Sequence, residues 1–121
     1  MNIRDMDKYR NTFWDWTLLN NCFGDTKIRV TDIDGLVERH GCFLLIETKL
    51  PGNEVPQGQR ILLDAWVAMP KCNAVVVWGR NSMPEEYQIW GYDDQPIPTN
   101  TEGFQRLIRR WYDRANKNLI E

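Results

Sequence analysis

Two short segments carry charged side chains at a spacing that could serve chemistry. Asp32 and Asp34 stand two residues apart. Glu47 and Lys49 have the same spacing and follow an apolar run, Phe43–Ile46. Along a β-strand, residues two apart lie on the same face, so each pair would share one face. A carboxylate in a central strand costs free energy unless it is paired or bound to a metal ion. The spacing therefore indicates a site.

A turn at Glu38–Gly41 would pair the two segments as a hairpin and bring their acids together at the end remote from the turn. Converging carboxylates make a hard oxygen site that suits Mg²⁺ or Mn²⁺. The candidate metal ligands are Asp34, Glu47 and the backbone carbonyl of Thr48. Lys49 would hold or deprotonate an attacking water and neutralise charge on a phosphate. The alternative is an ordinary cross-strand salt bridge on an exposed face.

Hydrophobic periodicity predicts the elements that must position these residues. Helices are expected at about residues 4–22, 56–69 and 101–118, and strands at about 27–37, 42–50, 73–78 and 87–92, with a loop over 93–100. Strands that alternate with helices in this order predict an α/β fold, a mixed β-sheet flanked by helices. The length predicts one domain that spans residues 1–121.

One polar residue in the helix at 56–69 points to the same site. Gln59 falls on one helical stripe with Leu62, Leu63 and Trp66, so it should face the sheet from the first turn. A buried amide needs a hydrogen-bond partner, and the metal site is the nearest candidate. The alternative is that Gln59 caps the helix or binds a neighbouring backbone group.

Asp34 on one strand and Glu47-Thr48-Lys49 on the next resemble the signature of the PD-(D/E)XK nuclease superfamily, and of its small phage-encoded members in particular. The resemblance covers about residues 4–80, and the proline that often precedes the first acid is absent. It implies a restriction-endonuclease-like αβββαβ core, here with an added C-terminal helix. It further implies Mg²⁺-dependent hydrolysis of DNA phosphodiester bonds that leaves a 5′-phosphate, in recombination, repair or phage DNA processing. Endonuclease and exonuclease action both stay open.

The resemblance also implies roles for single residues. Asp34 and Glu47 would hold the metal, Lys49 would position the attacking water and Gln59 would order the site. Asp32 would be a supporting acid behind the metal ligands. Some branches of the superfamily add an acid from the first helix, where this chain has three, and nothing in the sequence selects among them: Asp5, Asp7 and Asp15.

Positive charge is concentrated in the last predicted helix. The chain has 17 acidic and 15 basic residues and a formal net charge of −2, which is unfavourable for binding a polyanion. Five cations crowd one helix face and would neutralise DNA phosphates: Arg106, Arg109, Arg110, Arg114 and Lys117. The alternative is a solvated face whose cations complement the helix dipole.

A domain of this length has little room for a separate DNA-reading module, so a homodimer or a protein partner is expected. The alternative function is a catalytically inactive nuclease fold that serves as a binding or inhibitor subunit. The sequence has no membrane-length apolar run and no signal-peptide pattern. Three widely spaced cysteines predict reduced thiols. The expected location is the cytoplasm, or the host cytoplasm if the protein is phage-encoded.

Overall fold

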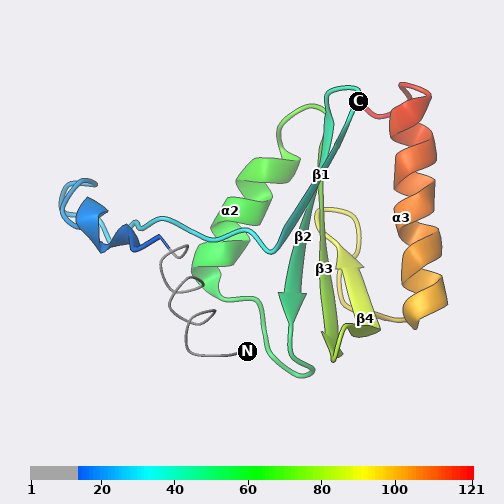
Figure 1. Ribbon diagram of the computed structural model, residues 1–121, viewed down its shortest axis with the longest axis horizontal. Coiled ribbons are helices and arrows are strands. Elements are labelled where there is room, and N and C mark those ends of the chain that lie inside the picture. The colour runs from blue at the N-terminus through cyan, green and yellow to red at the C-terminus, as the bar shows by residue number, and fades with distance from the viewer. Residues whose placement is uncertain (1–13) are drawn as a thin grey trace, which may run out of the picture. The chain divides into compact units, whose positions relative to one another are not determined.

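The computed structural model describes residues 14–121, which divide into two compact units between Asp32 and Ile33. In residues 33–121 a five-stranded sheet lies between two helices (Figure 1). The strands are β1 (Gly35–Arg39), β2 (Cys42–Lys49), β3 (Cys72–Arg80), β4 (Met83–Ile89) and β5 (Ile97–Pro98), and the helices are α2 (Gln57–Val67) and α3 (Thr101–Asn116). The predicted α/β fold with a mixed, helix-flanked sheet is confirmed.

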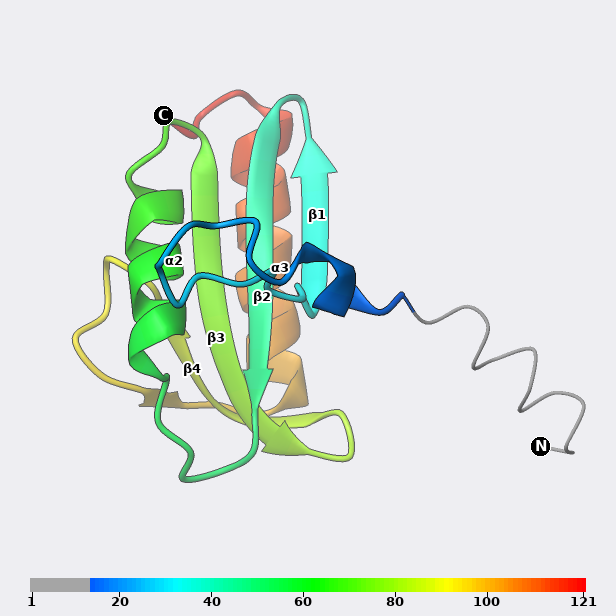
Figure 2. The same cartoon turned by 90° about the vertical axis from the view of Figure 1, so that its left-hand side faces the viewer.

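The sheet has the strand order β1-β2-β3-β4-β5. The β1–β2 hairpin is antiparallel, β2 and β3 are parallel, and β3, β4 and β5 are antiparallel to their neighbours. Parallel neighbours need a crossover connection, and α2 supplies it between β2 and β3. Figure 2 shows α2 in front of the sheet and α3 behind it, so the helices cover opposite faces. The start of α2 therefore follows the end of β2 after a short loop.

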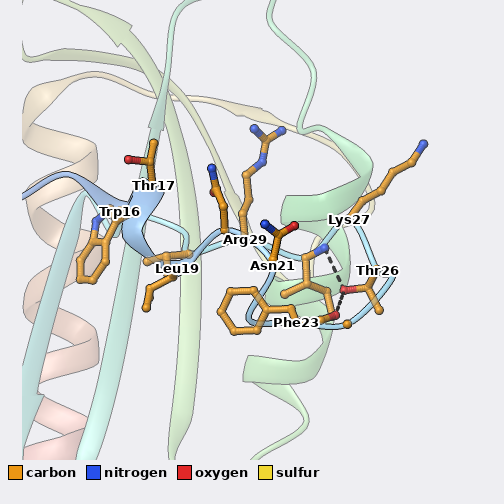
Figure 3. A pocket seen from close by; sticks show the side chains of 12 residues that line it. Trp16, Thr17, Leu19, Asn21, Phe23, Thr26, Lys27 and Arg29 are labelled. Carbon is orange, nitrogen blue, oxygen red and sulfur yellow. Dashed lines mark hydrogen bonds between the residues drawn. The ribbon is translucent and has the colours of Figure 1, made fainter.

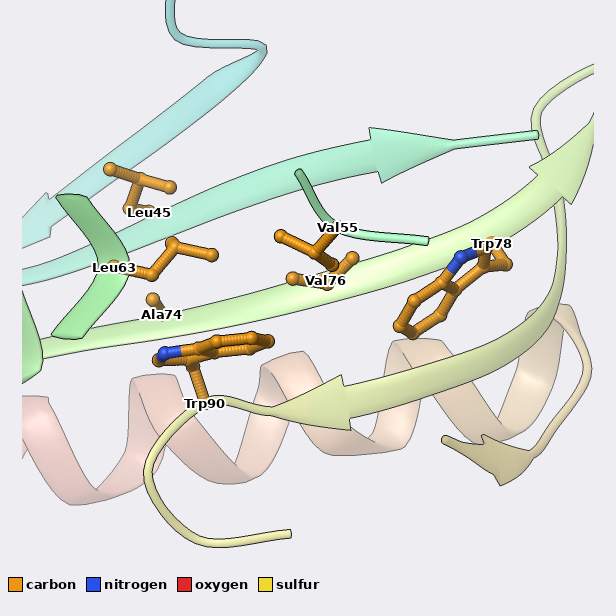
Figure 4. Packing of buried hydrophobic residues seen from close by; sticks show 7 residues of the cluster. All are labelled: Leu45, Val55, Leu63, Ala74, Val76, Trp78 and Trp90. Carbon is orange, nitrogen blue, oxygen red and sulfur yellow. The ribbon is translucent and has the colours of Figure 1, made fainter. Parts of the chain in front are cut away.

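Each face of the sheet carries its own hydrophobic cluster, because side chains alternate between faces along β2 and β3. The cluster on the α2 side contains Leu45, Val55, Leu63, Ala74, Val76, Trp78 and Trp90 (Figure 4). The cluster on the α3 side contains Leu44, Val75 and Phe104, with Ile46, Val77, Tyr87, Leu107, Ile108 and Trp111 packed against it. All members lie within residues 33–121, so this unit has a core of its own.

Local sequence explains the helix boundaries. Pro56 is the N-cap of α2, where a proline loses nothing because the first amides of a helix have no internal partner. Asn100 is the N-cap of α3, and its side chain accepts a hydrogen bond from the Gly103 amide at 2.8 Å. Both helices therefore begin close to where the sequence predicts.

The predicted strand at 27–37 is wrong over its first part, because residues 27–34 form no strand and β1 begins at Gly35. Pairing between β1 and β2 ends where Gly35 lies opposite Ile46. Beyond that point the Asp34 carboxylate, instead of a backbone carbonyl, accepts the hydrogen bond from the Thr48 amide. A side chain thus replaces the next step of the strand ladder.

Three further boundaries differ from the prediction. Strand β4 runs from Met83 to Ile89 instead of 87–92, and the predicted loop at 93–100 contains the two-residue strand β5. Of the predicted helix at 4–22, the described part has only a 3-10 helix, Trp16–Leu19, and the rest lies outside the described residues. Two strands precede α2 in the described part of the chain, whereas the family resemblance implies three.

Residues 14–32 form a loop, and side chains between Trp16 and Val30 line an open pocket of about 620 Å³ (Figure 3). The Thr26 hydroxyl donates a hydrogen bond to the Phe23 carbonyl at 2.7 Å and accepts one from the Ile28 amide at 3.3 Å. These bonds close the loop without regular secondary structure. None of the helices that the structure describes is long and apolar enough to cross a membrane.

Candidate metal and nucleic-acid site

The end of β2 brings Asp34 against the segment that carries Glu47 and Lys49. The Asp34 Oδ2 atom accepts two hydrogen bonds from Thr48, one from the backbone amide at 2.8 Å and one from the hydroxyl at 3.0 Å. These bonds fix the carboxylate beside the strand. The second oxygen of Asp34 has no hydrogen bond among the described residues and is free to bind a ligand.

Glu47 is the buried charge of the site. Its side chain is 6% exposed, and it shares a sheet face with Leu45, which packs on the α2 side. Burial raises the pKa of Glu47, and repulsion from Asp34 raises it further. The charge of Lys49 and a hydrogen bond from the Asp34 backbone lower the same pKa by less. The Asp34 carboxylate is therefore close enough to oppose the ionisation of Glu47.

The Thr48 carbonyl is directed toward the same edge as Asp34. The amide and carbonyl of one strand residue point to the same side of the strand, and the Thr48 amide bonds to Asp34. The β1–β2 pairing ends at Ile46, so no β1 backbone group lies opposite Thr48. The carbonyl oxygen therefore faces the gap beside the Asp34 carboxylate, as a metal ligand would.

Gln59 carries a hydrogen-bond acceptor that finds no donor in the described part of the chain. Its Oε1 atom is buried and has no hydrogen-bond partner among residues 14–121. Leu62, Leu63 and Trp66 of the same helical stripe pack in the α2-side cluster, so Gln59 lies on the side of α2 that faces the sheet. Buried acceptors are nearly always satisfied in native proteins. A water or a cation would satisfy this one.

The oxygen donors near the end of β2 fit a hard divalent cation. Mg²⁺ is typically held by one or two carboxylates and keeps several waters, and this site offers two carboxylates and a carbonyl. Within residues 14–121 there is no group of three or more histidine, cysteine or acidic side chains that could hold a metal ion. A fully protein-enclosed metal cage is thus absent from the described residues, whereas an open, water-rich Mg²⁺ site fits them.

Four other acids belong to the prediction, and the structure describes two of them, Asp32 and Asp15. The argument that placed Asp32 on the face of Asp34 is wrong, because Asp32 lies in no strand. Its supporting role stays a prediction. Asp5 and Asp7 lie outside the described residues. Asp15 caps the 3-10 helix, where its Oδ1 accepts a hydrogen bond from the Thr17 amide at 2.9 Å, and this bond lowers the pKa of Asp15.

The five predicted DNA-binding cations are all exposed on α3: Arg106, Arg109, Arg110, Arg114 and Lys117. Helix α3 covers the sheet face opposite α2, whereas Glu47 lies on the α2 side (Figure 1). A ligand that contacts both the cations and the carboxylates must therefore pass around an edge or an end of the sheet. The sequence did not reveal this separation, because it depends on which face each helix covers.

Sequence reasoning missed the role of the Thr48 side chain. Its hydroxyl bonds to Asp34, in addition to the carbonyl that the sequence proposed as a ligand. The only available signal was the identity of the middle residue in Glu47-Thr48-Lys49, and that position carries no fixed requirement in the signature.

Comparison of the chain with protein-family models, with curated proteins and with solved structures finds no match. The resemblance to PD-(D/E)XK nucleases therefore rests on the residues described above.

Proposed function

We propose that the protein is a Mg²⁺- or Mn²⁺-dependent nuclease that hydrolyses DNA phosphodiester bonds. The observation that carries the proposal is the Glu47 carboxylate, which is 6% exposed in a central strand and lies beside a second carboxylate. Such a placement is unfavourable in the metal-free protein, and a bound cation would offset its cost. The neighbouring Lys49 adds the cation that phosphate chemistry requires.

Each residue then has a distinct task. A divalent ion at this site would polarise the phosphate and lower the pKa of a bound water. Asp34 and Glu47 would hold the ion, with Asp34 oriented by its two bonds from Thr48. The half-buried Lys49 would orient the attacking water and neutralise charge that grows on the phosphate oxygens. Gln59 would bind a water of this cluster through its Oε1 atom.

The decisive test is metal-dependent cleavage of plasmid and linear DNA. Wild-type protein should cleave with Mg²⁺ or Mn²⁺ and not in EDTA. Lys49→Ala should lower the rate by about 100-fold or more, because it removes a group that acts on the reacting phosphate. Lys27→Ala, which removes an exposed lysine of the other unit, is the matched control and should cleave at the wild-type rate. Equal rates for wild type and Lys49→Ala would remove Lys49 from the mechanism.

The same assay addresses the alternative of an inactive nuclease-fold subunit. A protein that binds DNA but cleaves none of the substrates with either ion would support that alternative. Cleavage that is lost with Lys49→Ala would rule it out. The unpartnered oxygen of Gln59 favours the active form, because a buried acceptor in a site calls for a donor such as a bound water.

A further inference from the structure

Two adjoining cavities run from the proposed site to α3. The first, of about 470 Å³, is lined by Thr48 and Lys49 and by Ser82, Met83 and Pro84 of the β3–β4 hairpin, among others. The second, of about 430 Å³, shares Ser82 and Pro84 with the first and is also lined by Arg109 of α3. We call the two together the hairpin groove. It adjoins the proposed site at Thr48 and Lys49, and its Val77 and Phe104 belong to the α3-side cluster.

The β3–β4 turn gives the groove its shape. Asn81 and Ser82 have φ values of 54° and 60°, and the strand register shifts between Trp78 and Gly79. A side chain at position 79 would collide with the Met83 carbonyl, so only glycine allows the two strands to approach this closely. The turn therefore holds Met83, which is 57% exposed, at the wall of the groove.

The groove combines an apolar lining with one cation in each of its two cavities. Lys49 and Arg109 are its only charged lining residues. Val77, Met83 and Pro84 line its first cavity, and Phe104 and Ile108 line its second. Exposed Leu50, at 61% exposure, lies next to Lys49 in the chain and also lines the first cavity. These two cations suit phosphates, and the apolar walls suit the faces of sugars and bases.

The other arginines of α3 serve as an internal comparison. Arg110 and Arg114 line a different cavity, of about 530 Å³, together with Asn73, Tyr92 and the C-terminal Glu121. Arg109 and Arg110 are thus adjacent, equally charged and both exposed, yet they line different cavities. A ligand of the hairpin groove should distinguish them.

Resting on the nuclease proposed above, we propose that the hairpin groove binds a single-stranded segment of the substrate DNA, which continues from the scissile phosphate across the β3–β4 hairpin to Arg109. A duplex keeps its bases stacked inside and presents mainly phosphates and sugars to a protein surface. An apolar groove matches a single strand better, because its unstacked bases can pack on apolar side chains such as Leu, Met and Pro. The preferred substrate is therefore DNA with a single-stranded tail or flap.

The first experiment measures binding in EDTA, where hydrolysis cannot contribute. A duplex with a single-stranded tail of about ten nucleotides, within the range that single-strand-binding surfaces cover, is compared by fluorescence anisotropy with the blunt duplex. Wild type should bind the tailed DNA more tightly. Arg109→Gln should reduce the slope of log affinity against log salt for tailed DNA by about 0.7, the value for one phosphate contact in a single strand. The control Arg110→Gln should reduce that slope less, because Arg110 lines a different cavity.

The second experiment tests the apolar wall. Met83→Ser should weaken binding of tailed DNA by about fivefold, the low end of the effect of losing a base contact, and leave blunt-duplex binding unchanged. The control is Met69→Ser, which changes a methionine of similar exposure, 46%, that lines neither cavity of the groove. Both variants alter exposed side chains, and a thermal melt of each variant is used to check that it remains folded.

The results separate this inference from the proposed function. Equal effects of the Arg109 and Arg110 substitutions, or equal affinity for tailed and blunt DNA, would overturn the groove assignment even if metal-dependent cleavage occurs. Selective loss of tailed-DNA binding with Arg109→Gln and Met83→Ser would support the groove even if no cleavage is found, and the nuclease proposal would then fail alone.

Discussion

Two features of the site disfavour the ionised form of Glu47. Its folded-state pKa is raised above the ordinary value of 4.5 by burial and by the charge of Asp34. The folded protein therefore binds the Glu47 proton more tightly than the unfolded chain does. Ionised Glu47 destabilises the metal-free fold as the pH rises through the folded-state pKa, and the penalty is absent below 4.5.

We therefore predict that Glu47→Gln raises the melting temperature of the metal-free protein near pH 8, because it removes a buried charge and keeps the shape of the side chain. The gain should shrink as the pH falls through the folded-state pKa of Glu47 and vanish near pH 4. Thermal melts in EDTA across this range measure it. A gain that is constant with pH would mean that the charge of Glu47 is not its cause.

A bound ion should reverse this difference in melting temperature between wild type and Glu47→Gln. Mg²⁺ or Mn²⁺ at 100 times its dissociation constant stabilises a protein by about 2.7 kcal/mol through mass action. We predict that either ion raises the melting temperature of wild type and does so much less for Asp34→Asn and Glu47→Gln. Asp93→Asn, which changes a carboxylate that bonds to the Ile89 amide and lines no part of the site, is the control and should respond like wild type. Equal shifts in all four proteins would place the metal elsewhere.

At the scale of elements, the β2–α2–β3 crossover determines what the site contains. It places the first turn of α2 over the sheet face that carries Glu47, and the helix anchors itself there through Leu63, which is fully buried. Trp66 adds a hydrogen bond from its indole nitrogen to the Asn73 carbonyl at 2.7 Å. These contacts fix the rotation of α2 and with it the direction of Gln59.

We predict opposite effects of Gln59→Met on stability and on catalysis. The change replaces an unpartnered buried oxygen with an apolar side chain of similar size, so it should stabilise the metal-free protein by about 1 kcal/mol. It should also lower the cleavage rate, because a water of the metal cluster loses its acceptor. Denaturant melts and cleavage assays test the two effects. Gln57→Met, on an exposed position of the same turn, should change neither.

At the scale of the whole molecule, the chain divides between Asp32 and Ile33 into two compact units, and the longer unit has a hydrophobic core. Both hydrophobic clusters lie within residues 33–121, together with Asp34, Glu47, Lys49 and Gln59. The second unit therefore contains what its folding and its proposed chemistry require.

We predict that a fragment of residues 33–121 folds on its own with a cooperative thermal transition. It should bind Mg²⁺ or Mn²⁺ as the full chain does, as judged by the shift in melting temperature. Circular dichroism of the fragment and of the full chain makes the comparison. A fragment without a cooperative transition would support the single domain of residues 1–121 that the sequence predicts.

The sequence predicts this fold best where packing and local signals agree. The apolar run of β2, the valines of β3 and Pro56 before α2 identify the centre of the sheet and its crossover. Alternation alone misassigned residues 27–34, since Ile28 and Val30 have the spacing of a strand but no ladder partner. For the candidate site, the spacing of the residues predicted that Asp34, Glu47 and Lys49 lie together. It carried no information about which sheet face α3 covers or about the groove that the β3–β4 turn forms.

Gly79 has a consequence for how this protein can vary. The Met83 carbonyl occupies the space of a side chain at position 79, and the same close approach holds the turn beside Lys49. In a library that randomises the hairpin, position 79 should accept glycine alone. Position 82, where Ser82 has a φ of 60°, should be enriched in glycine, asparagine and aspartate. Selection for folding alone would then preserve the shape of the groove, and binding preferences could evolve only through the side chains that line it.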